Sequence, residues 1–83
     1  MRVPDNAELR TIYGQALGQA GDLFHAYLNL AYAGLYENNP RQMLFQMDKA
    51  KSMAKTDADR RELVRLEETS KTRMKLLGKS IFQ

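Results

Sequence analysis

The stretch Gly14-Gln15-Ala16-Leu17-Gly18-Gln19-Ala20-Gly21-Asp22-Leu23-Phe24-His25-Ala26 decides the fold of this chain. Small side chains at Gly14 and Ala26 let two helix backbones approach closely. Between them, Gly21 can end one helix in the left-handed conformation that glycine tolerates, and Asp22 can cap the start of the next. The pattern predicts two antiparallel helices joined by a tight turn, with Gly14 facing Ala26 where the helices cross.

Turn and cap signals divide the chain into four predicted helices, at about 6–20, 22–37, 40–55 and 58–77. Asn39 precedes Pro40, which is tolerated in the first turn of a helix, and Thr56 or Asp57 can cap the last helix. Gly78 ends that helix, and 78–83 is expected to be a flexible tail. Short connections make consecutive helices antiparallel. The sequence therefore predicts an all-α domain of four antiparallel helices, arranged as two stacked helical hairpins.

Apolar residues recur at helical spacing in all four segments. The segment 22–37 is apolar nearly all round, which predicts a central helix packed on two sides. Gly34 is expected to permit close helix approach there. The other three segments each carry one apolar stripe, and these stripes are Leu9, Ile12, Tyr13, Ala16, Leu17 and Ala20; Met43, Leu44, Met47, Ala50 and Ala54; and Leu63, Leu66, Ser70, Met74 and Leu77.

Composition excludes several classes of protein. The 83 residues contain no cysteine and a single histidine, so neither a disulfide nor a thiolate zinc site can stabilise the fold. The net charge of +3, from 13 basic and 10 acidic residues, is too small to indicate nucleic-acid binding by itself. No apolar run is long enough for a membrane span, and nothing in the sequence resembles a catalytic motif. We expect a non-enzymatic chain without a cofactor or metal site.

One polar line interrupts the apolar surface of the segment 22–37. Its candidate partner-binding residues are His25, Asn29, Tyr32 and Tyr36. They lie three or four positions apart and therefore on one face of a helix. Since the remaining faces are apolar, this line is expected to face solvent or a ligand, and the tyrosines favour a groove for an extended peptide. The alternative interpretation is that the line is only the solvated edge of a central helix.

Basic residues along 58–77 offer a different hypothesis. Arg61, Arg65, Lys75 and Lys79 can share one side of that segment. Glu67 and Glu68 interrupt the positive charge, and the segment has no aromatic residue on which a base could stack. A solvated face of mixed charge is the favoured interpretation over a nucleic-acid surface.

The order of motifs also resembles a known family. The residues 6–33 align with the tetratricopeptide consensus, with Gly14 on the small residue of the first helix and Gly21 on the turn glycine. Arg10 stands where that consensus has a large aromatic residue. Asn38-Asn39, Asp48-Lys49-Ala50-Lys51 and Thr56-Asp57-Ala58-Asp59 continue the pattern. Over roughly 4–68 the chain resembles the C-terminal tetratricopeptide-like domain of bacterial BepA-like zinc metallopeptidases.

That resemblance implies a protein-binding or regulatory appendage in the periplasm or cell envelope. Its partners would be an extended peptide or the peptidase domain of the parent chain. Zinc in that family is held by a His-Glu-x-x-His helix of the catalytic domain, a motif that this sequence lacks. The alternative is a free-standing cytoplasmic helical adaptor or chaperone-like protein, and a nucleic-acid-binding helical domain is the third hypothesis.

Overall fold

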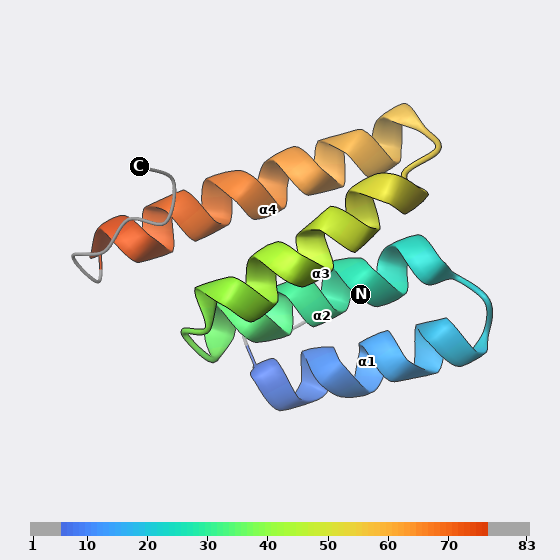
Figure 1. Cartoon of the computed structure of the whole chain (residues 1–83), viewed down its shortest axis with the longest axis horizontal. Helices are drawn as coiled ribbons and strands as arrows, with labels where there is room; N and C mark the ends of the chain where they lie inside the picture. The colour runs from blue at the N-terminus through green and yellow to red at the C-terminus, as the bar shows by residue number, and fades with distance from the viewer. Residues whose placement is uncertain (1–5, 77–83) are drawn as a thin grey trace.

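The computed structural model describes residues 6–76 and is all-α. Its four helices are α1 (Ala7–Gln19), α2 (Leu23–Tyr36), α3 (Pro40–Met53) and α4 (Asp57–Leu76). Consecutive helices run antiparallel, with α1 and α4 on opposite outer sides (Figure 1). The predictions of an all-α fold and of four helices are confirmed for the described residues, and the adjacent pairs α1–α2 and α2–α3 are consistent with helical hairpins. The helix limits are close to those expected. The predicted flexible tail, 78–83, lies outside the described residues.

The turn between α1 and α2 follows the prediction from Gly21 and Asp22. Gly21 has a φ of 89°, a conformation that glycine adopts without a steric penalty. The backbone N–H of Asp22 then donates to the Leu17 carbonyl at 2.9 Å, which satisfies an end carbonyl of α1. The Asp22 side chain caps α2 by accepting from the His25 backbone N–H at 3.3 Å.

The turn between α2 and α3 repeats this arrangement with asparagines. Asn38 has a φ of 58°, and the Asn39 backbone N–H donates to the Gly34 carbonyl at 2.9 Å. The Asn39 side chain caps α3 through the backbone N–H of Gln42 at 3.2 Å. Each turn contains three residues between the two helices, and these short connections hold α1, α2 and α3 as adjacent antiparallel neighbours.

A capping box starts α4. The Thr56 hydroxyl accepts from the backbone N–H of Asp59 at 3.0 Å, and the Asp59 carboxylate accepts from the backbone N–H groups of Lys55 and Thr56. Of the two residues predicted as possible caps, Thr56 is the one that the structure uses.

Two glycines set the close packing of α2 with its neighbours. A Cβ on Gly14 would lie 2.9 Å from Leu30 Cγ and 3.1 Å from the Ala26 carbonyl oxygen. A Cβ on Gly34 would lie 2.8 Å from the Met43 backbone nitrogen. The predicted contact of Gly14 with Ala26 is confirmed, as is the role of Gly34 in close helix approach.

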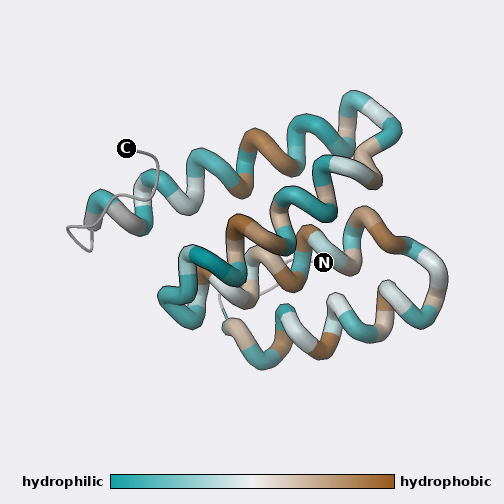
Figure 2. The backbone as a smooth tube through the Cα atoms, in the orientation of Figure 1, coloured by the Kyte–Doolittle hydropathy of each residue, from teal (hydrophilic) through white to brown (hydrophobic). Residues whose placement is uncertain are grey.

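The core is built mainly from α2 and α3. α1–α2 and α2–α3 are the closely packed pairs, whereas α4 approaches α2 and α3 less closely. In Figure 2 the tube of α4 is mostly hydrophilic, with a hydrophobic stretch toward its middle. The buried cluster consists of Phe24, Leu28, Ala31, Tyr32, Leu35, Met43, Met47, Ala50, Leu63 and Leu66. Leu44, Met53 and Ala54 pack partly buried against it.

The predicted stripe of α4 is only partly described. Leu63, Leu66 and Ser70 are buried as expected, and the Ser70 hydroxyl donates to the Glu67 carbonyl at 2.9 Å. The Met74 side chain and Leu77 lie outside what the structure describes. Lys51 of α3 and Glu67 of α4 form an ion pair at 3.6 Å, which joins the two helices on one side. No helix within residues 6–76 is long and apolar enough to cross a membrane.

Candidate functional site

The polar line predicted on α2 is less exposed than expected. His25 keeps a side chain that is 45% exposed and Tyr36 is half-buried, but Asn29 and Tyr32 are only 7% and 6% exposed. The expectation that the whole line faces solvent or a ligand is therefore wrong for Asn29 and Tyr32. The role of the four residues in partner binding stays a prediction.

Arg10 of α1 contacts both Asn29 and Tyr32 and contributes to their burial. Its Nη1 donates to Asn29 Oδ1 at 2.9 Å, and its guanidinium carbon lies 4.2 Å from the centroid of the Tyr32 ring. The Asn29 amide nitrogen donates in turn to the His25 backbone carbonyl at 2.8 Å. Both ends of the Asn29 amide thus have intramolecular partners, and the Tyr32 ring is covered by a cation that attracts its π face.

Tyr32 also faces α4, so three helices converge on this side chain. Burial raises the pKa of the Tyr32 hydroxyl, while the charge of Arg10 and a hydrogen bond with the Thr69 side chain act in the opposite direction. Glu62 and Arg65 of α4 are near enough to influence the same pKa, with opposite signs. This is a buried polar junction between α1, α2 and α4.

Tyr36 continues the arrangement toward the other end of α2. Its ring centroid lies 6.0 Å from that of Tyr32, and the guanidinium carbon of Arg73 lies 5.3 Å from the Tyr36 centroid. Arg73 Nη2 also donates to the Tyr36 backbone carbonyl at 3.5 Å. Arg10, Tyr32, Tyr36 and Arg73 form a continuous series of cation–ring and ring–ring contacts, which we call the Arg–Tyr ladder.

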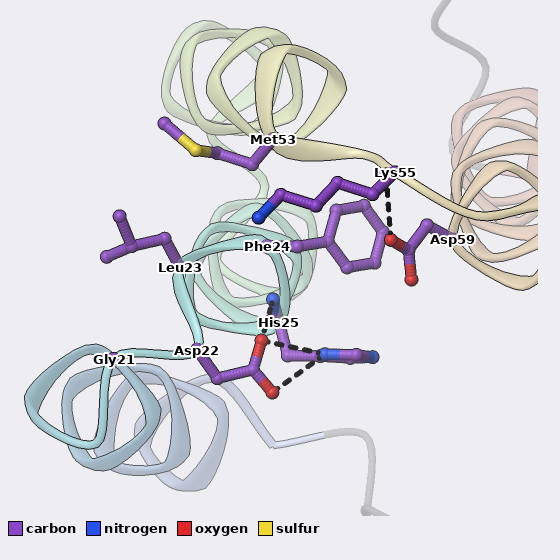
Figure 3. A pocket seen from close by; sticks show the side chains of 8 residues that line it. All are labelled: Gly21, Asp22, Leu23, Phe24, His25, Met53, Lys55 and Asp59. Atoms are coloured by element: carbon purple, nitrogen blue, oxygen red, sulfur yellow. Dashed lines mark hydrogen bonds and ion pairs between the residues drawn. The ribbon is translucent and has the colours of Figure 1, made fainter.

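His25 belongs to a different place, a small cleft at the N-terminal end of α2. Figure 3 shows side chains from the α1–α2 turn, the end of α3 and the start of α4 around it. The cleft has a volume of about 200 Å³, and its lining includes Asp22, Phe24, His25, Lys55 and Asp59. The structure thus separates His25 from the tyrosines with which the sequence pattern grouped it.

The polar groups of this cleft serve the helix ends. The Asp22 carboxylate lies 2.9 Å from His25 Nδ1 while it caps α2. The hydrogen bonds that Asp59 accepts, first from the backbone of Lys55 and then from Thr56, hold the pKa of its carboxyl below the usual value, and His25 acts in the same direction. Among the described residues that line the cleft, none carries a hydroxyl or thiol.

Among residues 6–76, no group of three or more histidine, cysteine, aspartate or glutamate side chains could hold a metal ion.

The apolar stripe of α1 provides a surface that the sequence did not assign to a site. Leu9, Ile12 and Tyr13 are 40%, 53% and 38% exposed, and Gly14 is the one residue of α1 that is buried. α1 packs on α2 through Gly14, and the larger apolar side chains consequently point elsewhere. We call Leu9, Ile12 and Tyr13 the α1 outer face.

Comparison with known proteins gave no match. No protein-family model, curated protein or solved structure matches this chain.

Proposed function

We propose that this chain is a non-catalytic protein-interaction domain, and that the α1 outer face is its main contact surface. The observation that supports the proposal is the exposure of Leu9, Ile12 and Tyr13 on one helix. These side chains lie three or four positions apart, so they share a face of α1. Contiguous exposed apolar side chains are typical of protein interaction sites, whereas single exposed ones are ordinary.

The chemistry of this face suits a polypeptide partner. Leu9, Ile12 and Tyr13 carry no charge, and Tyr13 offers a large ring with a polar end, a residue type that is enriched at interfaces. α1 is also held firmly by Gly14 against α2. A rigid helix loses little conformational entropy when a partner binds, which leaves more of the contact energy for affinity.

We further propose that the domain is the C-terminal tetratricopeptide-like tail of a bacterial envelope zinc metallopeptidase, as the sequence resemblance implies. The antiparallel packing of α1, α2 and α3 supports this. Gly21 and Asn38 occupy equivalent positions in two similar turns, separated by half of a repeat of about 34 residues. The partner would then be an extended peptide or the peptidase domain of the same protein, and zinc would belong to that peptidase domain.

A pair of substitutions with equal exposure tests the contact surface. Ile12 and Val64 are both β-branched, both helical and both 53% exposed, but Val64 lies on α4, away from the α1 outer face. The chain and its Ile12→Glu and Val64→Glu variants are applied to an immobilised library of short overlapping peptides. We expect Ile12→Glu to abolish the peptide signals and Val64→Glu to leave them unchanged, with both variants as stable as the parent. Equal binding by all three proteins would refute the α1 outer face as the contact surface.

A further inference from the structure

Two arginines of the Arg–Tyr ladder carry a positive charge that no carboxylate neutralises within residues 6–76. Arg60 pairs with Asp57 at 3.1 Å and Arg65 with Glu62 at 3.5 Å. Arg10 and Arg73 form no such ion pair among the described residues, although both are half-buried. Their charges are stabilised by the rings of Tyr32 and Tyr36 instead.

The same two side chains have unused hydrogen-bonding capacity. The Nε atoms of Arg10 and Arg73 are buried and have no hydrogen-bond acceptor among the described residues. A guanidinium has five N–H donors, and the hydrogen bonds described for each of these two side chains use one nitrogen. A half-buried cation with unsatisfied donors is costly unless an acceptor or an opposite charge compensates for it.

The surroundings of the ladder have an excess of positive charge. Near Tyr32, α4 adds Arg65, whose side chain is 71% exposed, and Glu62, whose side chain is 37% exposed. Around Tyr32, two arginines therefore stand against one glutamate, and a third arginine, Arg73, lies against Tyr36. This complementarity favours an anionic partner that offers carboxylates to arginine, a geometry in which two parallel hydrogen bonds can form.

We propose that the Arg–Tyr ladder, with Arg65 beside it, binds an acidic segment of a partner polypeptide. The segment's carboxylates contact Arg65, Arg73 and the accessible part of Arg10, and its apolar side chains contact the exposed part of Tyr36. This inference rests on the proposed function, because it names the chemistry of the partner that the domain recognises.

A polypeptide fits the ladder better than a nucleic acid does. The ladder arginines are separated by two tyrosine rings, and Arg65 is held by Glu62. A phosphate backbone carries one charge per nucleotide and is bound through many cation contacts, whereas this surface offers only three arginines, two of them separated by neutral rings. A peptide can place isolated acidic residues opposite isolated arginines and keep neutral residues between them.

The test uses three fluorescent peptides in which leucine alternates with glutamate, glutamine or lysine, together with a single-stranded oligothymidylate. Binding to the whole chain is measured by fluorescence anisotropy at low and high salt. We expect the glutamate peptide to bind more tightly than the glutamine and lysine peptides, and salt to weaken this binding. Arg65→Gln and Arg73→Gln should each weaken it about tenfold, the effect of losing one hydrogen bond to a charged group.

Arg60→Gln is the matched control, because Arg60 is exposed and pairs with Asp57 at the start of α4. It should leave the affinity for the glutamate peptide unchanged. Thermal unfolding of each variant identifies any loss of fold, and Arg65→Gln keeps the test valid if Arg73→Gln is unstable. Equal affinity for the glutamate and glutamine peptides would overturn the inference. If Ile12→Glu still abolished the binding of both peptides, the proposed function would stand without it. Preferential binding of oligothymidylate would overturn the inference as well.

Discussion

The guanidinium of Arg10 lies over the ring of Tyr32, with its central carbon 4.2 Å from the ring centroid. Arg10 joins α1 to α2 by this cation–ring contact and by a hydrogen bond to Asn29. The polar line of α2 is consequently part of an internal junction as well as a candidate binding surface. The spacing of residues within α2 could not reveal this junction, because Arg10 lies on α1 and meets α2 only where the two helices pack.

A double-mutant cycle measures this junction. Arg10→Met keeps much of the side-chain volume and removes the charge, while Tyr32→Leu removes the ring. We expect a coupling free energy of about 0.5–2 kcal/mol, the range for cation–π pairs from exposed to desolvated sites. Urea unfolding of the parent, both single variants and the double variant gives this value. Additive effects of the two substitutions would contradict a direct interaction.

Gly14 and Gly18 form a second matched pair, one turn apart on α1. A Cβ at Gly14 would meet Leu30 at 2.9 Å and the Ala26 carbonyl oxygen at 3.1 Å, whereas a Cβ at Gly18 would meet only the Ala26 Cβ at 3.7 Å. Gly14→Ala should lower the free energy of unfolding by about 1–3 kcal/mol through overpacking. Gly18→Ala should raise it by about 0.5–1 kcal/mol, because alanine favours helix. Urea unfolding that gives both variants the same sign would contradict the close approach at Gly14.

Gly34→Ala should destabilise the chain more than Gly14→Ala does. The atoms that a Cβ at Gly34 would meet are the backbone nitrogen and Cα of Met43, at 2.8 and 3.1 Å. A backbone cannot rotate away as the Leu30 side chain can, so relief requires α2 and α3 to separate. We expect a loss at the upper end of about 1–3 kcal/mol, or beyond it. Thermal unfolding that ranks Gly14→Ala as the more damaging change would show that α3 can move.

The local signals of the sequence predicted the helices and turns well. Gly21, Asp22, Asn39 and Thr56 act through backbone groups within a few residues of themselves, so their effects depend little on the rest of the fold. The packing glycines were also predictable, since a glycine inside a helix costs stability unless a close contact requires it.

Contacts between distant segments were not predictable in this way. Three apolar residues of α1 are exposed because α1 packs on α2 through Gly14. The helical period of the apolar residues does not by itself show which side of the helix faces the core. The burial of Tyr32 depends on Arg10 and on α4, which contribute side chains from opposite ends of the chain. Arg73 could have been singled out only by knowing that α4 lies near Tyr36.

The capping box of α4 makes an acid-dependent contribution to stability. Hydrogen bonds from the backbone of Lys55 and from Thr56 lower the pKa of Asp59 in the folded chain. The ionised form is therefore favoured by folding, so this contribution is present above the unfolded pKa of about 3.9 and is lost as the pH falls through the lower folded pKa. Urea unfolding of the parent and of Asp59→Asn, at pH values from about 6 down to about 2, should give a flatter acid dependence for the variant. Identical profiles would show that the capping carboxylate does not titrate with folding.

Chemical-shift mapping tests the proposed interaction surface most directly. The strongest peptide from the library is titrated into the isotope-labelled chain, and the amide shifts are followed along all four helices. We predict that the largest shifts fall on α1 around Leu9, Ile12 and Tyr13, with smaller shifts on α4 around Arg65 and Arg73. Shifts concentrated on α3, with α1 unchanged, would contradict the proposal.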